Sequence, residues 1–387
     1  MWPKNENQEY ITKLGKSIAD RIKITASKHD RAGTFPHEHF EFMRENGYLS
    51  AAIPVKNGGG GHGLTDIVLA QYEIGCGDGS TAVSVGMHQM IIGAEIEGKK
   101  WPAQLRERVF NEIAKKGALI NSVASESDLG SPRGGGRPQT TLVPVNRGNW
   151  ILNGRKIWST LSPGLSYAII FAAVEDGTGD IARVIQSMDS NGISIEETWD
   201  SMSMRASGSH DIVFKDVNVS EEDFIFRANS ANKTKPVVFG DAWFPLLLSA
   251  SNLGIANAAR CYAIDFAINR KPSGAPKPIS KIPFVREQIA RIESKLLIAK
   301  RSLFSCAEDW ETYPNQRQDM LAEVSVIKIR SIDTAIEVTD LAMRVVGAVG
   351  LDRNRPLERY LRDARSGIAN PPIEARALEQ VAAQILD

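Results

Sequence analysis

Residues 150–163 read Trp-Ile-Leu-Asn-Gly-Arg-Lys-Ile-Trp-Ser-Thr-Leu-Ser-Pro and combine a turn signal with an aromatic side chain suited to ligand binding. Asn153-Gly154 separates two strand-like runs, which predicts a β-hairpin with a type I′ turn. Beyond this turn Trp158 and Thr160 are two residues apart, so we expect them on one face of a single strand. An indole beside a hydroxyl donor favours binding of a flat heteroaromatic ring.

A polar loop precedes this stretch by about thirty residues. Residues 125–132 read Ser-Glu-Ser-Asp-Leu-Gly-Ser-Pro and follow a strand-like run, 118–124. The loop and residues 153–160 resemble two motifs of the acyl-CoA dehydrogenase superfamily, T-E-x-x-x-G-S-D and N-G-x-K-x-W-I-T, which together hold the flavin of FAD. Ser125 replaces the usual Thr, and Pro132 the usual Asp. The resemblance implies these cofactor-binding residues: Ala124, Ser125, Ser131, Trp158, Ser159 and Thr160.

The composition narrows the functions to be considered. The 387 residues carry 46 acidic and 46 basic side chains, so no net charge favours nucleic acid or an anionic membrane surface. Three cysteines without a C-x-x-C spacing argue against disulfides and structural zinc. No signal-length apolar segment begins the chain, and no apolar run approaches a membrane span of about 18 residues. These patterns predict a cytoplasmic protein without a metal or a membrane segment.

The hydrophobic period changes twice along the chain and predicts three domains. Residues 1–117 form an all-helical N-terminal domain, with helices expected at 8–29, 37–46, 64–74, 80–96 and 102–116. Residues 118–220 form an antiparallel β-barrel or sandwich, with further strands expected at 140–145, 167–174, 182–186, 193–197 and 211–217. Residues 221–387 form an antiparallel helical bundle with long helices at 283–310 and 320–346. The resemblance implies that this arrangement is the acyl-CoA dehydrogenase fold.

Three segments near the C-terminus strengthen the resemblance. Residues 262–270 keep the Arg of a family motif that reaches the FAD of a neighbouring subunit, and residues 344–351 match the glycine turn Q-x-x-G-G-x-G-[FY], with Arg344 in place of Gln. Residues 358–365 match E-x-x-x-R-D-A-[RK], the segment that precedes the active site. The resemblance implies that Arg270, Arg344, Gly347 and Ala348 complete the cofactor site of a neighbouring subunit in a homodimer or homotetramer.

The usual catalytic base of the family has no counterpart in this sequence. Most members carry it as the Glu of Y-E-G-T, nine residues after the Arg of R-D-A, and here that count from Arg362 reaches Pro371. Other members place the Glu at the start of the first bundle helix, where this chain has Phe244. The remaining catalytic candidates are His88, Asn370, Glu374 and Asp241. The residues expected to line the substrate pocket are His88, Ser131, Phe244, Asn370 and Pro371.

Three functions are consistent with these residues. The first is α,β-dehydrogenation of an acyl-CoA-like substrate by a protein that binds FAD and passes electrons to an electron-transfer flavoprotein. The second is a two-component monooxygenase that uses reduced flavin, FMN in that case, together with O₂ and a flavin reductase. The monooxygenases on this fold keep a His in an H-x-P loop, where this chain has Asn370. The third is a flavin-binding subunit without turnover. The number of matching motifs favours the first.

Overall fold

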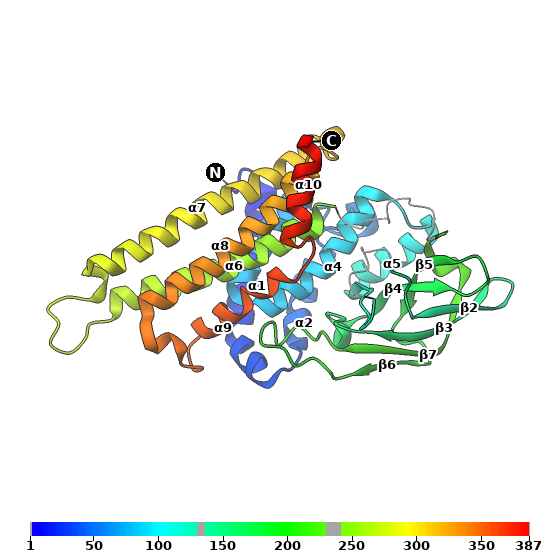
Figure 1. Ribbon diagram of the computed structural model, residues 1–387, viewed down its shortest axis with the longest axis horizontal. Coiled ribbons are helices and arrows are strands. Elements are labelled where there is room, and N and C mark those ends of the chain that lie inside the picture. The colour runs from blue at the N-terminus through cyan, green and yellow to red at the C-terminus, as the bar shows by residue number, and fades with distance from the viewer. Residues whose placement is uncertain (1, 130–135, 230–240, 387) are drawn as a thin grey trace.

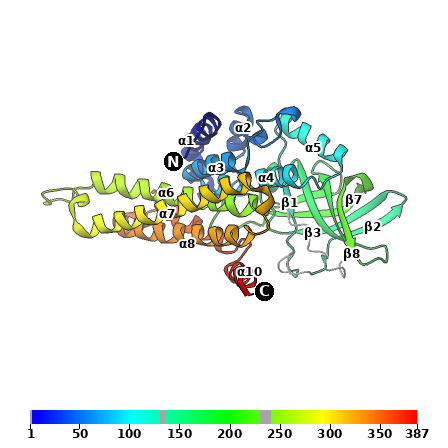
Figure 2. The same cartoon turned by 90° about the horizontal axis from the view of Figure 1, so that it is seen from above.

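The protein forms ten α-helices and eight strands over the described part of the chain, and the order of these elements confirms the predicted fold class. The structure is a computed structural model that describes residues 2–129, 136–229 and 241–386. Figure 1 shows the sheet at one end of the molecule and the long helices α6, α7 and α8 extending to the other end. Seen from above in Figure 2, the N-terminal helices cover one side, and α10 projects on the opposite side.

The N-terminal helices follow the predicted amphipathic pattern closely. In α1 the apolar residues Ile11, Ile18 and Ile22 are fully buried, and Asn5 caps the helix by accepting a hydrogen bond from the Gln8 amide. Gly117 ends the last of these helices in a left-handed conformation. The helices are α1 (Glu6–Ala32), α2 (His37–Glu45), α3 (Leu64–Gly77), α4 (Gly79–Gly98) and α5 (Ala103–Lys116).

The strands form one sheet in which strands of both directions occur. The order is β6-β7-β3-β2-β4-β5-β8, and β1 joins β4 in parallel. Strand β2 also pairs with β4 in parallel, so the sheet is not purely antiparallel. The strands are β1 (Ile120–Val123), β2 (Thr141–Asn146), β3 (Asn149–Lys156), β4 (Tyr167–Val174), β5 (Asp180–Ser187), β6 (Ile193–Glu196), β7 (Asp211–Ser220) and β8 (Phe224–Asn229).

The predicted turn at Asn153-Gly154 is wrong, because β3 passes straight through both residues. The hairpin turn lies earlier, where Gly148 takes a φ of 83° between the paired Asn146 and Asn149. At Gly154 the pairing of β3 with β7 shifts register, and a Cβ at this position would lie 2.5 Å from the Thr140 hydroxyl oxygen. The Asn-Gly pair therefore marks a bulge with a close side-chain approach, for which the same residue types are favoured.

The last part of the chain is a bundle, but it begins later than expected. The prediction that the chain is helical after residue 220 is wrong at β8, which pairs with β5 at the sheet edge. The helices that follow are α6 (Trp243–Asn269), α7 (Pro283–Thr312), α8 (Leu321–Val346), α9 (Leu357–Asp363) and α10 (Glu374–Leu386). None of the helices in the described ranges is both long and apolar enough to cross a membrane.

Helix α6 joins the bundle to the N-terminal helices at very short range. A Cβ on Gly254 would lie 2.3 Å from the Tyr72 carbonyl oxygen, and one on Gly75 would lie 2.5 Å from the Ser251 carbonyl oxygen. The backbones of α3 and α6 therefore touch, which only glycine permits at these two positions. This contact fixes α4 beside the first turns of α6, and both helices supply walls of the cavity described below.

Candidate active site

A cavity of about 960 Å³ lies where the sheet meets the helices. Its walls come from α4, from β1 and the loop after it, from the segment that follows β3, from Arg183 of β5, from residues 198–211, from the start of α6 and from residues 366–371. These segments are far apart in sequence and meet only in the folded chain. The volume lies at the upper end of the range for small-molecule pockets, so the cavity can hold a large ligand or a ligand with a cofactor.

Trp158 presents its indole to this cavity, although not from a strand. Strand β3 ends at Lys156, and Trp158 takes a left-handed conformation with a φ of 52°. The Thr160 amide donates a 3.0 Å hydrogen bond to the Trp158 carbonyl oxygen, which makes a tight turn. The prediction that the two residues share a strand face is therefore wrong. Both nevertheless line the cavity, and 67% of Trp158 is exposed.

A buried ion pair brings the two predicted cofactor motifs together. Lys156 Nζ lies 2.6 Å from Glu126 Oε1, and both side chains are almost fully buried. Glu126 also accepts hydrogen bonds from the Gln139 and Thr140 amides, at 2.6 and 3.0 Å. Next to the pair, the Ile157 amide donates a 3.0 Å hydrogen bond to the Ser125 carbonyl oxygen. The loop that carries Ala124 and Ser125 is therefore fixed beside Trp158.

Hydrogen bonding keeps this pair ionised. Burial alone would raise the pKa of Glu126, but the hydrogen bonds from Lys156, Thr140 and Gln139 together bring that pKa below its ordinary value. Burial lowers the pKa of Lys156 to about 8, against the opposing effect of Glu126. At neutral pH the lysine therefore remains protonated beside a carboxylate. The two charges pair with each other, and neither residue is among those that line the cavity.

Hydroxyl groups and apolar side chains occupy different walls. Thr160, Ser209 and Ser207 form a row in which successive hydroxyl oxygens lie 2.9 and 2.7 Å apart. Sequence reasoning missed Ser207 and Ser209, because serines on an irregular segment carry no periodic signal. The apolar wall comes from α4 and α6 and consists of Val83, Met87, Met90 and Phe244. Phe244, which the sequence analysis expected in a substrate pocket, is thus part of this cavity wall.

Two carboxylates are found among the described residues that line the cavity, Asp200 and Asp211. Asp211 accepts hydrogen bonds from Arg155 Nε and from the Thr198 hydroxyl, both at 2.8 Å. The Asp200 side chain is 91% exposed and lies 3.3 Å from Arg205 Nη1. Because Asp211 is paired with a guanidinium and Asp200 is almost fully in solvent, neither has the buried and unpaired position expected of a general base.

The geometry does not support a pocket role for His88. The imidazole is fully buried, with Nε2 2.8 Å from the Leu49 carbonyl oxygen and Nδ1 accepting a hydrogen bond from the Ile120 amide at 3.2 Å. Burial lowers its pKa to about 4. Its neighbours Met87 and Met90 face the cavity instead. His88 therefore connects α4 to the start of the sheet as a neutral side chain.

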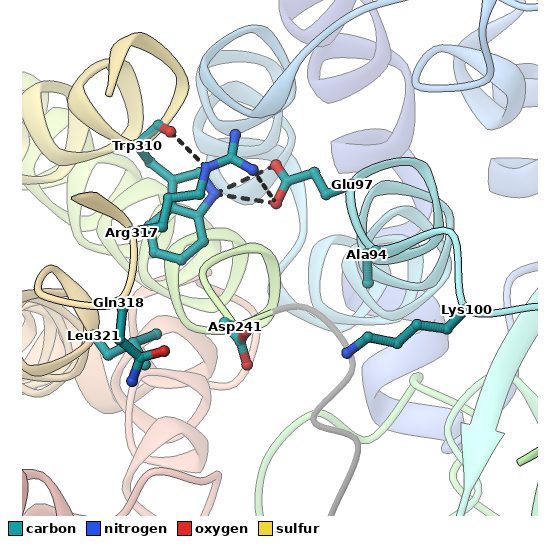
Figure 3. Close-up of a pocket in the computed structure, with 9 residues that line it drawn as sticks. Ala94, Glu97, Lys100, Asp241, Trp310, Arg317, Gln318 and Leu321 are labelled. Atoms are coloured by element: carbon teal, nitrogen blue, oxygen red, sulfur yellow. Dashed lines mark hydrogen bonds and ion pairs between the residues drawn. The ribbon is translucent and has the colours of Figure 1, made fainter. Parts of the chain in front are cut away.

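The two acidic candidates for a relocated base lie elsewhere. Glu374 begins α10 and is exposed. Asp241 lines a separate cavity of about 180 Å³, where Lys100 extends toward it (Figure 3). Glu97 at that cavity accepts hydrogen bonds from the indoles of Trp243 and Trp310, at 2.8 and 3.1 Å, and lies 3.3 Å from Arg317. Neither candidate lines the larger cavity.

The other predicted cofactor residues divide into three groups. Ser159 is buried, and its hydroxyl has no partner among the described residues. Ser131 lies outside the described residues. The third group is Arg270, Arg344, Gly347 and Ala348, all exposed, and their segments lie at the end of the bundle away from the sheet (Figure 1). This group therefore does not contribute to the cavity of its own chain.

The walls fit a flavin on physical grounds. An exposed indole offers a stacking surface, and the adjoining Ser125 and Thr160 offer hydroxyl groups to ring heteroatoms. The buried unpartnered hydroxyl of Ser159 lies between Trp158 and Thr160 in the chain. Within the described ranges, no three His, Cys, Asp or Glu side chains are grouped so that they could hold a metal ion.

Helix α9 fixes the wall formed by residues 200–207. Asp363 Oδ1 accepts a 2.8 Å hydrogen bond from the amide of Met204, a cavity residue with a φ of 52°. Arg362 donates to the Met202 carbonyl oxygen at 2.9 Å and pairs with Asp30 of α1 at 2.7 Å. Asp363 is fully buried, which raises its pKa to about 7. The match at residues 358–365 thus has a structural role next to the cavity.

Comparisons with known proteins agree along nearly the whole chain. Three family models match: "Acyl-CoA dehydrogenase, N-terminal domain" over residues 4–116, "middle domain" over 122–217 and "C-terminal domain" over 246–369. YdbM of Bacillus subtilis (strain 168), whose name assigns it provisionally to the acyl-CoA dehydrogenases, is 37% identical over 386 residues, which cover 99% of this chain and 98% of YdbM.

Other relatives are named after a reaction other than acyl-CoA dehydrogenation. The amino sugar nitrososynthase RubN8 of Streptomyces rubradiris is 27% identical over 392 residues, which cover 98% of this chain and 90% of RubN8. Among solved structures, KijD3 in complex with FMN and dTDP-3-amino-2,3,6-trideoxy-4-keto-3-methyl-D-glucose superposes with a TM-score of 0.88 at 25% identity. That match covers 99% of this chain and 95% of KijD3.

Asp363 predicts an unusual pH dependence of stability. Its pKa is about 7 in the folded protein and near 3.8 in the unfolded chain, so between these values only the folded state holds the proton. The contribution of Asp363 to stability is therefore present below about pH 4 and is lost as the pH rises toward 7, by up to about 4 kcal/mol. Asp363→Asn retains an acceptor for the Met204 amide and removes this titration.

Urea unfolding of both proteins at about pH 5 and about pH 8 measures the effect. We expect the parent protein to lose stability relative to the Asn variant at the higher pH. An equal difference in the free energy of unfolding at the two pH values would contradict the assignment.

Proposed function

The chain belongs to the acyl-CoA dehydrogenase family, and from this premise we propose that it is a flavin-dependent oxidoreductase with its flavin against Trp158. The exposed indole in a cavity large enough for a flavin supports this proposal. So does KijD3, which contains FMN and matches 99% of this chain. We propose FMN or FAD as the cofactor. A bound flavin would supply two-electron redox chemistry, and the protein residues would bind it and orient the substrate.

We propose that the reaction is of the monooxygenase type, with O₂ as co-substrate and reduced flavin supplied by a reductase. One observation carries this choice: residues 369–371 line the cavity with Ala, Asn and Pro, where a dehydrogenase of the family carries its base. Asp200 and Asp211, the two carboxylates noted in the cavity wall, are exposed and ion-paired respectively. Oxygen-dependent chemistry does not require a carboxylate that removes an α-proton. The nitrososynthase name of RubN8 agrees with this choice.

A second candidate is α,β-dehydrogenation of an acyl-CoA, with electrons passed to an electron-transfer flavoprotein. The similarity to YdbM at 37% identity favours it. This reaction needs a base near the flavin, and the cavity wall offers hydroxyl groups and the amides of Asn121 and Asn370. The two candidates therefore differ in whether an acyl-CoA can reduce the bound flavin.

Anaerobic mixing of the flavoprotein with short- to long-chain acyl-CoA thioesters separates these reactions. We expect no bleaching of the flavin absorbance, either in the parent protein or in Pro371→Glu. Ile373→Glu, which adds a carboxylate at an exposed position of the same segment, is the matched control. A dehydrogenase that has lost its base would instead gain acyl-CoA-dependent reduction in Pro371→Glu, by roughly 100- to 10,000-fold. Reduction of the unaltered protein would also exclude the monooxygenase proposal.

Trp158 is expected to contribute directly to flavin affinity. Trp158→Ala should weaken binding of FMN or FAD by about 1 to 3 kcal/mol, because it removes a stacking partner and its buried area. Trp158→Phe keeps an aromatic ring and should restore most of the affinity. Titration of the apoprotein followed by fluorescence measures both variants. Unchanged affinity in Trp158→Ala would place the flavin elsewhere.

We also propose that the protein is a homodimer or homotetramer in which Arg270 and residues 344–348 serve the flavin of a neighbouring subunit. Their distance from the cavity of their own chain supports this arrangement. Arg270→Ala should weaken flavin binding without changing the mass in sedimentation, whereas Lys271→Ala, at the next exposed position, should not. A monomer that retains stoichiometric flavin would rule out the proposal.

A further inference from the structure

Lys328 of α8 is a buried lysine whose hydrogen-bond partners are three backbone carbonyl oxygens of one segment. Its Nζ donates to Gly367 at 2.8 Å, to Asn370 at 2.6 Å and to Pro372 at 3.1 Å. The side chain is almost fully buried, with 2% of the residue exposed. The three acceptors lie between α9 and α10, in the segment that supplies Ala369, Asn370 and Pro371 to the cavity wall.

An ammonium group suits this position for a specific reason. It has three N–H donors and no acceptor, so three converging carbonyl oxygens use its hydrogen-bonding capacity completely. Buried lysines are rare, because the charge loses its hydration, and hydrogen bonds to a charged donor offset part of that cost. Burial lowers the pKa of Lys328 to about 8, and Asp333 opposes this shift. The lysine is therefore mainly protonated at neutral pH and can use all three donors.

These hydrogen bonds decide which groups the segment presents to the cavity. The carbonyl oxygens of Gly367, Asn370 and Pro372 each accept a hydrogen bond from Lys328, on the side of the segment that packs against α8. Asn370 Nδ2 donates a 3.2 Å hydrogen bond to the Ser366 carbonyl oxygen. The side-chain oxygen Oδ1 of Asn370 takes no part in this hydrogen bond. The residues that this segment presents to the cavity are Ser366, Ala369, Asn370 and Pro371.

We propose that Lys328 is a positioning residue of the active site: its ammonium holds residues 366–372 so that Asn370 and Pro371 face the substrate. This proposal rests on one part of the proposed function, namely that the reaction takes place in the cavity. Lys328 contacts neither the cavity nor a ligand and acts through the segment. Its effect should therefore be confined to that segment, unlike the effect of a residue that stabilises the whole bundle.

Hydrogen–deuterium exchange of the full chain without added flavin tests this effect directly. Lys328→Met removes the three donors and keeps most of the apolar stem. Lys295→Met removes an exposed lysine that pairs with Glu337 of α8 and is the matched control. We expect amides of residues 366–370 to exchange roughly 10-fold faster or more in Lys328→Met, because the three hydrogen bonds that hold the segment are lost. Peptides from α7 and from the rest of α8 should keep their parental rates in both variants.

Chemical rescue separates an ammonium requirement from a packing defect. Lys328→Ala leaves the Cβ, and n-propylammonium supplies the missing three carbons and the charged nitrogen. We expect n-propylammonium to restore slow exchange of residues 366–370, and n-propanol, of similar size but neutral, to fail. The amine is added during purification if Lys328→Ala does not fold without it, and recovery of folded protein with the amine but not the alcohol supports the same conclusion.

Two results would overturn the proposal. One is parental exchange of residues 366–370 in Lys328→Met, and the other is equal acceleration throughout α8 and α10, which would show general loosening of the bundle. Neither measurement involves flavin or turnover. A chain that fails to bind FMN and FAD would refute the proposed function and leave the exchange result valid, so the two failures can be distinguished.

Discussion

The candidate active site depends on the buried ion pair between Glu126 and Lys156. Lys156 is the last residue of β3, Glu126 lies in the loop after β1, and the two amides that complete the carboxylate's hydrogen bonds lead into β2. One carboxylate thereby connects three segments that do not adjoin in sequence. Removal of one partner would leave a buried charge uncompensated, which costs about 3 to 5 kcal/mol in comparable cases. The irregular segment with Trp158 starts directly after this pair, so the position of the indole follows from it.

The helical side of the cavity is fixed by the same means. Arg362 and Asp363 hold residues 200–207 through backbone groups, and Lys328 holds residues 366–372 through three carbonyl oxygens. Three irregular segments of the cavity wall, after β3, at residues 200–207 and at residues 366–372, are thus each tied by a buried charged side chain of a regular element. This arrangement has a chemical consequence. The charged groups of Glu126, Lys156, Asp363 and Lys328 are used for structure, and the cavity wall is made mainly of hydroxyl groups, two amides and apolar side chains, with Arg183, Asp200 and Asp211 also in it.

The fold alone does not determine which reaction takes place in such a cavity. YdbM, RubN8 and KijD3 all match this chain over almost its whole length, yet their names indicate dehydrogenase, nitrososynthase and FMN-binding proteins. In this chain, the count from Arg362 leads to Pro371 where the family motif has its base, and the backbone around Pro371 is held by Lys328.

The sequence by itself determined the elements whose signal is local. The period of apolar residues predicted α7, α8 and β4 within two residues of their ends, because burial of one face requires that period. The paired motifs also predicted that Ser125 and Trp158 lie close together. The predicted strand conformation at Trp158 was wrong, because this residue takes a left-handed conformation. Only the tertiary structure decided the rest. Asn153-Gly154 suits a turn and a bulge equally well, and the approach of Thr140 selects the bulge. His88 and Lys328 carry no local signal, since their roles depend on which carbonyl and amide groups a distant segment brings to them.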